Sequence, residues 1–315
     1  MSFIMKNNNH HISYLAFICL SLAALAASCD RFDGDTMVPS YIKIDAINVV
    51  DNPSDSWSQE TGFFSSDIDA VNIVIWKKGD TAETTIGTFQ LPCKVPVLRS
   101  GLIDYVLITP AVKQDGISGK RISYPFYQVI RLDSVTLVAD SVIDFGTLQT
   151  KYISKTQMKV LWKEMFEPGP GELTLDSTVL RCYSLDTVRA SYGDYGCGVV
   201  RVPAGTTSVA FATDTTYTIN DPQATLYLEM DYWSDFDFSI ELKNPSYQQG
   251  PVNLVSHMVI FGKPEKGWQK IYINIGSTWS QHFNHYPDIR PHFTILNNEG
   301  RPGNLFIDNI KLIVM

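Results

Sequence analysis

The chain carries little positive charge for its length. Its 25 Lys and Arg residues are outnumbered by 33 Asp and Glu residues, which gives a formal net charge of −8 at pH 7. Proteins that bind DNA or RNA need a basic stripe that neutralises phosphates, whereas the basic residues here are scattered among acids. The composition therefore argues against nucleic acid as a partner.

Sequence signatures of catalysis are also missing. The chain has no G-x-S-x-G nucleophile elbow, no H-E-x-x-H zinc motif and no P-loop. Asp231, Asp235 and Asp237 invite comparison with the paired carboxylates of a glycosidase, but they share one short stretch, and nothing nearby marks one of them as the general acid. We predict that the protein is not an enzyme; the enzymatic alternative would depend on Asp231.

Cysteines are few, with five in 315 residues. No CxxC motif or Cys/His spacing suggests zinc. Cys182 and Cys197 are close in sequence, and we predict a disulfide between them in an oxidising envelope; two free thiols are the alternative. Cys93 would then be left over as a small, buried apolar residue.

The N-terminal apolar run, from Ile12 to Ala27, is shorter than the ~20 residues that a membrane-spanning helix needs. It follows the lone basic residue Lys6 and ends in small residues just before Cys29. This pattern resembles a bacterial lipoprotein signal peptide with its lipobox. The resemblance implies that residues 1–28 are a signal peptide and that the thiol of Cys29 is diacylated. An ordinary secretory signal and an uncleaved anchor helix are the alternatives.

Residues 29–40 read as a polar tether between the lipid and the first fold. Asp30, Asp33 and Asp35 follow the cysteine, and acids in this place resemble the surface-export signals of Bacteroidetes lipoproteins. The resemblance implies attachment to the outer membrane, on its external or its periplasmic face.

Residues 41–149 show apolar residues at every second position, as in Tyr41–Ile47 and Val71–Trp76. Short strands about ten residues apart, separated by Gly, Pro and Asp, are typical of a β-sandwich. We predict an immunoglobulin-like β-sandwich here and a linker at residues 150–159.

Residues 160–315 alternate in the same way, for example at Leu226–Trp233 and Ile271–Ile275. Together with Trp268–Ile273 and the closing Ile307–Ile310, these strands resemble the jelly-roll of carbohydrate-binding modules, the galactose-binding-like fold. The predicted fold class is therefore all-β: an N-terminal immunoglobulin-like β-sandwich followed by a C-terminal jelly-roll β-sandwich.

The resemblance to this family implies a structural calcium site. Jelly-rolls of this kind often hold calcium between an acid near the start of the domain and an acid in the closing strand, and Glu167 and Asp308 match these positions. Calcium needs six to eight oxygen ligands, so two surface acids without a metal are the alternative. No other cofactor is expected.

The resemblance also implies a sugar site, because such folds stack a sugar ring on exposed aromatic side chains. Trp233 and Trp279 fall at predicted strand ends, where recognition loops occur, and His282, Phe283 and Tyr286 follow in the next loop. The alternative for each aromatic residue is packing in the core.

Two functions remain open. In the first, the protein is a non-catalytic, lipid-anchored scaffold or interaction component that docks to other envelope proteins at the outer membrane. In the alternative, it is a surface glycan-binding lipoprotein that uses the loop aromatics of the jelly-roll.

Overall fold

The computed structural model describes residues 37–52, 64–166, 196–221, 223–245, 254–283 and 287–315, together with the backbone of 173–175, 178–179 and 182–183. Cys29, Glu167 and Tyr286 lie outside these ranges, and so does the side chain of Phe283. Their roles stay predictions.

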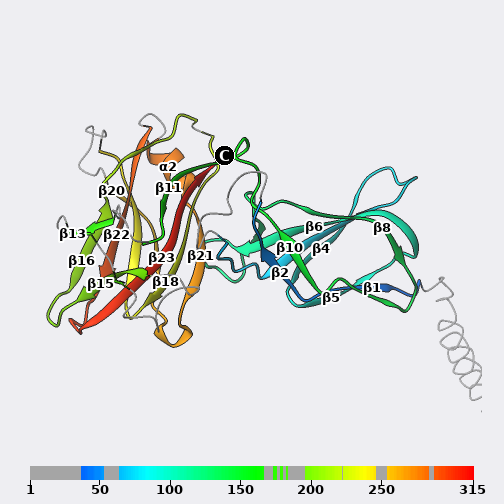
Figure 1. The fold of residues 1–315 in the computed structure, drawn as a ribbon, viewed down its shortest axis with the longest axis horizontal. Coiled ribbons are helices and arrows are strands. Elements are labelled where there is room, and N and C mark those ends of the chain that lie inside the picture. The colour runs from blue at the N-terminus through cyan, green and yellow to red at the C-terminus, as the bar shows by residue number, and fades with distance from the viewer. Residues whose placement is uncertain are drawn as a thin grey trace, which may run out of the picture.

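The described chain is almost entirely β-structure, which confirms the predicted fold class. Within these residues the helical elements are α2 (Gly276–Phe283) and the short 3-10 helix η2 (Pro264–Lys266). No described helix is both long and apolar enough to cross a membrane. The strands form two groups of sheets that lie end to end (Figure 1).

The first group contains a five-stranded sheet in the order β4-β3-β6-β7, with β8 also paired to β6. Its strands are β3 (Ala70–Trp76), β4 (Thr84–Gln90), β6 (Gly101–Lys113), β7 (Arg121–Ser123) and β8 (Ile130–Leu137). Against it lie β1 (Ser40–Ile44), β2 (Ala46–Val49), β5 (Cys93–Val97), β9 (Val142–Asp144) and β10 (Thr147–Thr150). β1 and β2 run parallel to β9 and β10.

Alternation explains this first core. On β3, Val71, Ile73 and Ile75 are buried and pack in one cluster with Ile42 and Ile44 of β1. The strand predicted for Tyr41–Ile47 is present but interrupted between β1 and β2. The immunoglobulin-like type of this sandwich stays a prediction.

The second group is a jelly-roll-like sandwich of two antiparallel sheets. One sheet has the order β14-β15-β23-β18-β21, with β11 also on β23. Its strands are β11 (Lys159–Glu164), β14 (Cys182–Tyr183), β15 (Gly196–Val202), β18 (Leu226–Ser234), β21 (Gln269–Asn274) and β23 (Gly303–Val314).

The opposing sheet has the order β13-β12-β16-β22-β19-β20, with β17 on β22. Its strands are β12 (Leu173–Leu175), β13 (Thr178–Val179), β16 (Ser208–Thr213), β17 (Tyr217–Thr218), β19 (Asp237–Lys243), β20 (Leu254–Ile260) and β22 (Asp288–Leu296). Leu228 and Met230 of β18 share the core with Phe238 and Ile240 of β19. The alternate residues of β18 therefore face the other side of the sheet, away from this core.

Residues 150–159, predicted as a linker, are packed in the structure. Tyr152 and Met158 are buried in one cluster with Tyr227 of the second sandwich, and the chain then enters β11, which pairs with β23. Residues 150–159 therefore pack against the second sandwich and lead directly into its sheet.

The two cysteines of the predicted disulfide occupy adjacent strands. Cys182 of β14 lies directly opposite Cys197 of β15 in the antiparallel register. Opposite residues in such a pair have Cα atoms roughly 4.5–5.5 Å apart, which is within the range that a disulfide spans. The bond itself stays a prediction, because only the backbone of Cys182 is described.

Candidate functional site

The two sandwiches meet on the outward face of β18, β21 and β23. The β6–β7 hairpin reaches onto β21, where the Asp115 amide donates to the Tyr272 carbonyl oxygen at 2.8 Å. The Asn274 amide donates to Asp115 Oδ1 at 3.0 Å. β21 is the edge strand of its sheet, so the hairpin covers backbone groups that an edge would otherwise expose.

An aromatic cluster fills the joint. Tyr124 packs edge-on against Tyr127 and Tyr272 with ring centroids 4.8 Å apart, and Tyr127 lies 5.0 Å from Tyr152. Edge-to-face pairs at these distances are favourable beyond the area they bury. The cluster joins residues from both sandwiches.

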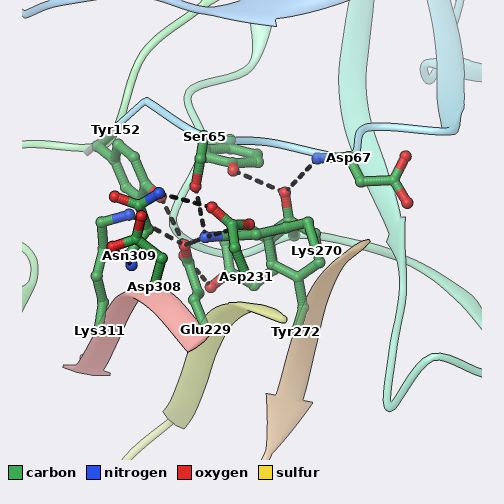
Figure 2. A network of polar contacts seen from close by, with 12 residues as sticks. Ser65, Asp67, Tyr152, Glu229, Asp231, Lys270, Tyr272, Asp308, Asn309 and Lys311 are labelled. Atoms are coloured by element: carbon green, nitrogen blue, oxygen red, sulfur yellow. Dashed lines mark hydrogen bonds and ion pairs between the residues drawn. The ribbon is translucent and has the colours of Figure 1, made fainter. Parts of the chain in front are cut away.

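Glu229 of β18 is the centre of a buried polar network in this joint (Figure 2). Its carboxylate accepts hydrogen bonds from the hydroxyls of Tyr124, at 2.6 Å, and Tyr152, at 2.8 Å. The ammonium groups of Lys270 and Lys311 lie 3.5 and 3.8 Å from Glu229 Oε2. One strand of the second sandwich thus binds a tyrosine of the first sandwich and a tyrosine of the connection between them.

A β-bulge gives the network its second acid. The pairing of β18 with β23 shifts register between Glu229 and Asp231. Opposite this shift, on β23, Asn309 has a left-handed φ of 48°, a backbone conformation that is common at β-bulges. Asn309 Nδ2 donates to Asp231 Oδ2 at 2.7 Å, and Lys270 Nζ lies 3.7 Å from Asp231 Oδ1. Lys270 Nζ also donates to Ser65 Oγ of the first sandwich at 2.8 Å.

Burial controls the protonation of this network. It raises the pKa of the Tyr124, Tyr127 and Tyr152 hydroxyls well above their ordinary value, so they remain hydrogen-bond donors. Burial, reinforced by the nearby Lys270, lowers the pKa of Lys311 to about 7. The contacts of this network join the two sandwiches. Glu229 and Asp231 are buried in it, so neither carboxylate is accessible from solvent in this structure.

Trp279 is wrongly predicted as a ligand platform. It lies on α2 instead of in a loop, and its side chain is 1% exposed in the second core. A ring without an exposed face cannot stack on a sugar. His282, in the last turn of the same helix, is exposed.

Trp233 lies on the outward face of β18. It is partly buried, and its ring centroid lies 6.4 Å from that of Phe306. It packs with Trp268 on a cluster of Cys197, Val199 and Phe306. The structure therefore brings Trp233 near a tryptophan that was not predicted as a site residue.

Asp308, the second predicted calcium ligand, is fully buried in the joint beside Asp231. The described residues contain no group of three or more His, Cys, Asp or Glu side chains arranged to hold a metal ion. The pairing with Glu167 stays a prediction.

A cavity of about 740 Å³ lies beside the polar network. Its walls come from the β6–β7 hairpin, the end of β20, η2 and the start of β21. Pockets that hold small ligands have volumes of roughly 300–1,000 Å³. The joint thus contains a cavity of ligand size next to the buried polar network.

The cavity combines an aromatic wall with hydrogen-bond donors. Trp268 and Phe261 supply rings. Lys263 and Lys266 add two exposed ammonium groups at the rim. This set matches a polar ligand that has an apolar face.

Gly262 fixes the cavity wall between Phe261 and Lys263. Its amide donates to Asp237 Oδ1 at 2.9 Å, and an added Cβ would lie 2.4 Å from the Phe236 carbonyl oxygen. Because backbone cannot give way as a side chain can, we expect Gly262→Ala to lower the free energy of unfolding by about 1–3 kcal/mol, measured by urea denaturation.

Gly119→Ala is the matched control, because a Cβ there has nothing within 4 Å. Equal stability of the two variants would contradict the tight packing at Gly262.

Sequence reasoning missed Trp268, Lys263 and Lys266 as site residues. The one available signal was a tryptophan at the start of a strand, directly after a glycine. Its meaning depends on the hairpin of the first sandwich, which lies about 150 residues earlier and forms the opposite wall.

The chain was compared with protein families, curated proteins and solved structures. No protein-family model and no curated protein matches the chain. Similar solved structures include the family 30 carbohydrate-binding module of a cellulosomal cellulase of Clostridium thermocellum, with 16% identity, a TM-score of 0.34, and coverage of 49% of this chain and 96% of the module.

Two further similar structures are also carbohydrate-binding modules. One is a family 61 module in complex with β-1,4-galactotriose, with 14% identity, a TM-score of 0.30, and coverage of 47% of this chain and 89% of the module. The other is a variant family 29 module, with 13% identity, a TM-score of 0.31, and coverage of 50% and 91%.

Proposed function

We propose that this protein is a lipid-anchored component of the bacterial outer membrane that binds a glycan in the cavity at the joint. The observation that carries the proposal is a cavity of about 740 Å³ whose lining combines the aromatic residues Trp268 and Phe261 with the exposed Lys263 and Lys266. A pyranose offers an apolar face for an aromatic ring and hydroxyl oxygens for the lysine ammonium groups.

The arrangement of the sandwiches supports this role. β1 starts at the end of the first sandwich that lies away from the second (Figure 1). A lipid at Cys29 would thus leave the first sandwich as a spacer, with the cavity held away from the membrane. The polar network keeps that spacer rigid.

The test is a glycan array followed by calorimetry with the mature chain, residues 29–315. We expect Trp268→Ala to weaken binding about 30-fold or more, as loss of a central aromatic contact does. Trp76→Ala is the matched control, because Trp76 is also partly buried but stacks on Tyr105 in the first sandwich. Unchanged affinity in Trp268→Ala would place the ligand elsewhere.

Docking to another envelope protein is the second candidate function. Phe261 and Ile117 line the cavity and are 64% and 53% exposed, and exposed apolar side chains around a hollow also suit a protein partner. A folded chain that binds no glycan but co-purifies with an envelope protein, and loses it in Phe261→Ser, would favour this function.

A further inference from the structure

An apolar surface covers the end of the first sandwich that is farthest from the joint. Twelve large hydrophobic side chains are exposed among the described residues, and half of them lie here. They are Met37 (68% exposed), Val38 (53%), Leu98 (63%), Leu102 (54%), Val138 (54%) and Val142 (44%). We refer to these six residues as the apolar tip.

Hydrogen bonds and strand pairing show that these residues, distant in sequence, share one end of the sandwich. The Asp140 amide donates to the Pro39 carbonyl oxygen at 2.9 Å, and Ser40 Oγ donates to the Arg99 carbonyl oxygen at 2.8 Å. The start of β6 pairs with the end of β8 at the same level. The chain start, the β5–β6 turn and the β8–β9 turn therefore meet.

The apolar tip departs from the usual chemistry of turns, which are mostly polar. Arg99, which follows Leu98 in the sequence, is paired with Asp80 at 2.8 Å. Exposed Asp140 lies between Val138 and Val142 in the β8–β9 turn. A cluster of exposed apolar side chains at one end of a domain marks a surface that another apolar phase covers.

We propose that the apolar tip inserts into the headgroup region of the lipid bilayer that anchors the chain. Met37 is eight residues after Cys29, and eight extended residues reach at most about 28 Å. If Cys29 carries lipid, the membrane is therefore within reach of the tip. Apolar side chains at that interface gain by leaving water. Lipidation would bring the membrane close to the tip, whereas the affinity of the tip for a bilayer comes from its own side chains. That affinity is independent of the glycan cavity, which lies at the other end.

The test uses the mature chain, residues 29–315, with Cys29→Ser so that no lipid contributes. Flotation with vesicles of phosphatidylethanolamine and phosphatidylglycerol measures its partition coefficient. We expect measurable binding that falls about tenfold or more in Leu98→Ser combined with Val138→Ser. Val129→Ser combined with Leu296→Ser, two exposed positions outside the tip, is the matched control and should bind as the parent does.

Thermal unfolding verifies that all three proteins are folded. A folded parent that does not bind vesicles, or a tip variant that binds as well as the control, would overturn the proposal. Sedimentation tests whether a second copy of the chain covers the apolar tip instead. A dimer of the parent that dissociates in the tip variant would make this surface an interface between copies and would overturn the proposal. Glycan binding at the joint should be the same in every variant, so that failure here leaves the proposed function untouched.

Discussion

Glu229→Ala is expected to lower the free energy of unfolding by about 3–5 kcal/mol. The substitution removes the acceptor for the Tyr124 and Tyr152 hydroxyls and leaves the buried ammonium groups of two lysines with less negative charge nearby. Groups that stay buried without a partner bear their full desolvation penalty. Urea denaturation, monitored by tryptophan fluorescence, measures the change.

The control is Glu265→Ala, on the exposed surface of η2, which should change stability by less than about 0.5 kcal/mol. Glu229→Gln should recover part of the loss, because an amide oxygen still accepts from one tyrosine but carries no charge. If Glu229→Ala were as stable as the control, the network would not hold the joint together.

The second large effect is a dependence of stability on pH that comes from Lys311. Its pKa is lowered to about 7 in the folded protein and is near 10.5 in the unfolded chain. Between these values the unfolded chain holds a proton that the folded chain lacks. Stability therefore rises with pH across this window, by about 1 kcal/mol per pH unit from this group, and is lowest below pH 7.

The groups that face Lys311 come from three strands. Burial is the largest cause of the lowered pKa of Lys311, and Lys270 of β21 is the second. Glu229 and Asp231 of β18 and Asp308 of β23 raise that pKa and so oppose the shift. Lys311→Met keeps a similar packed stem and removes the titrating group, so we expect it to flatten the profile. Urea midpoints at pH 6.5, 7.5 and 8.5 provide the measurement. A flat profile in the unmodified protein, or the same slope in Lys311→Met, would contradict this assignment.

Local patterns were sufficient to predict the strands and insufficient to predict the joint. Val71, Ile73 and Ile75 alternate along β3, and this period of two by itself places one face inside. Glu229 and Asp231 alternate equally well on β18, but a polar outward residue looks the same in sequence whether water or another sandwich covers it. Tyr124 and Tyr152, which pack against this face, cover Glu229 in the folded chain.

Trp279 and Trp268 show the same limit for aromatic residues. Trp279 was predicted at a strand end and Trp268 within a strand, but α2 places Trp279 in the core while Trp268 lines the cavity. Trp279 is a core residue and Trp268 a cavity residue because different elements pack around each ring, and those elements are distant in the chain. Composition cannot separate a core tryptophan from a binding tryptophan, because both contribute the same apolar area.

The amino-acid sequence by itself determined the all-β class and the positions of the main strands, because strand periodicity is a property of neighbouring residues. Only the tertiary structure decided that residues 150–159 are packed, that Glu229 is buried against two tyrosines, and that the hairpin and η2 enclose a cavity. These features depend on contacts between residues 77 to 159 positions apart, and such contacts leave no periodic signal in the chain.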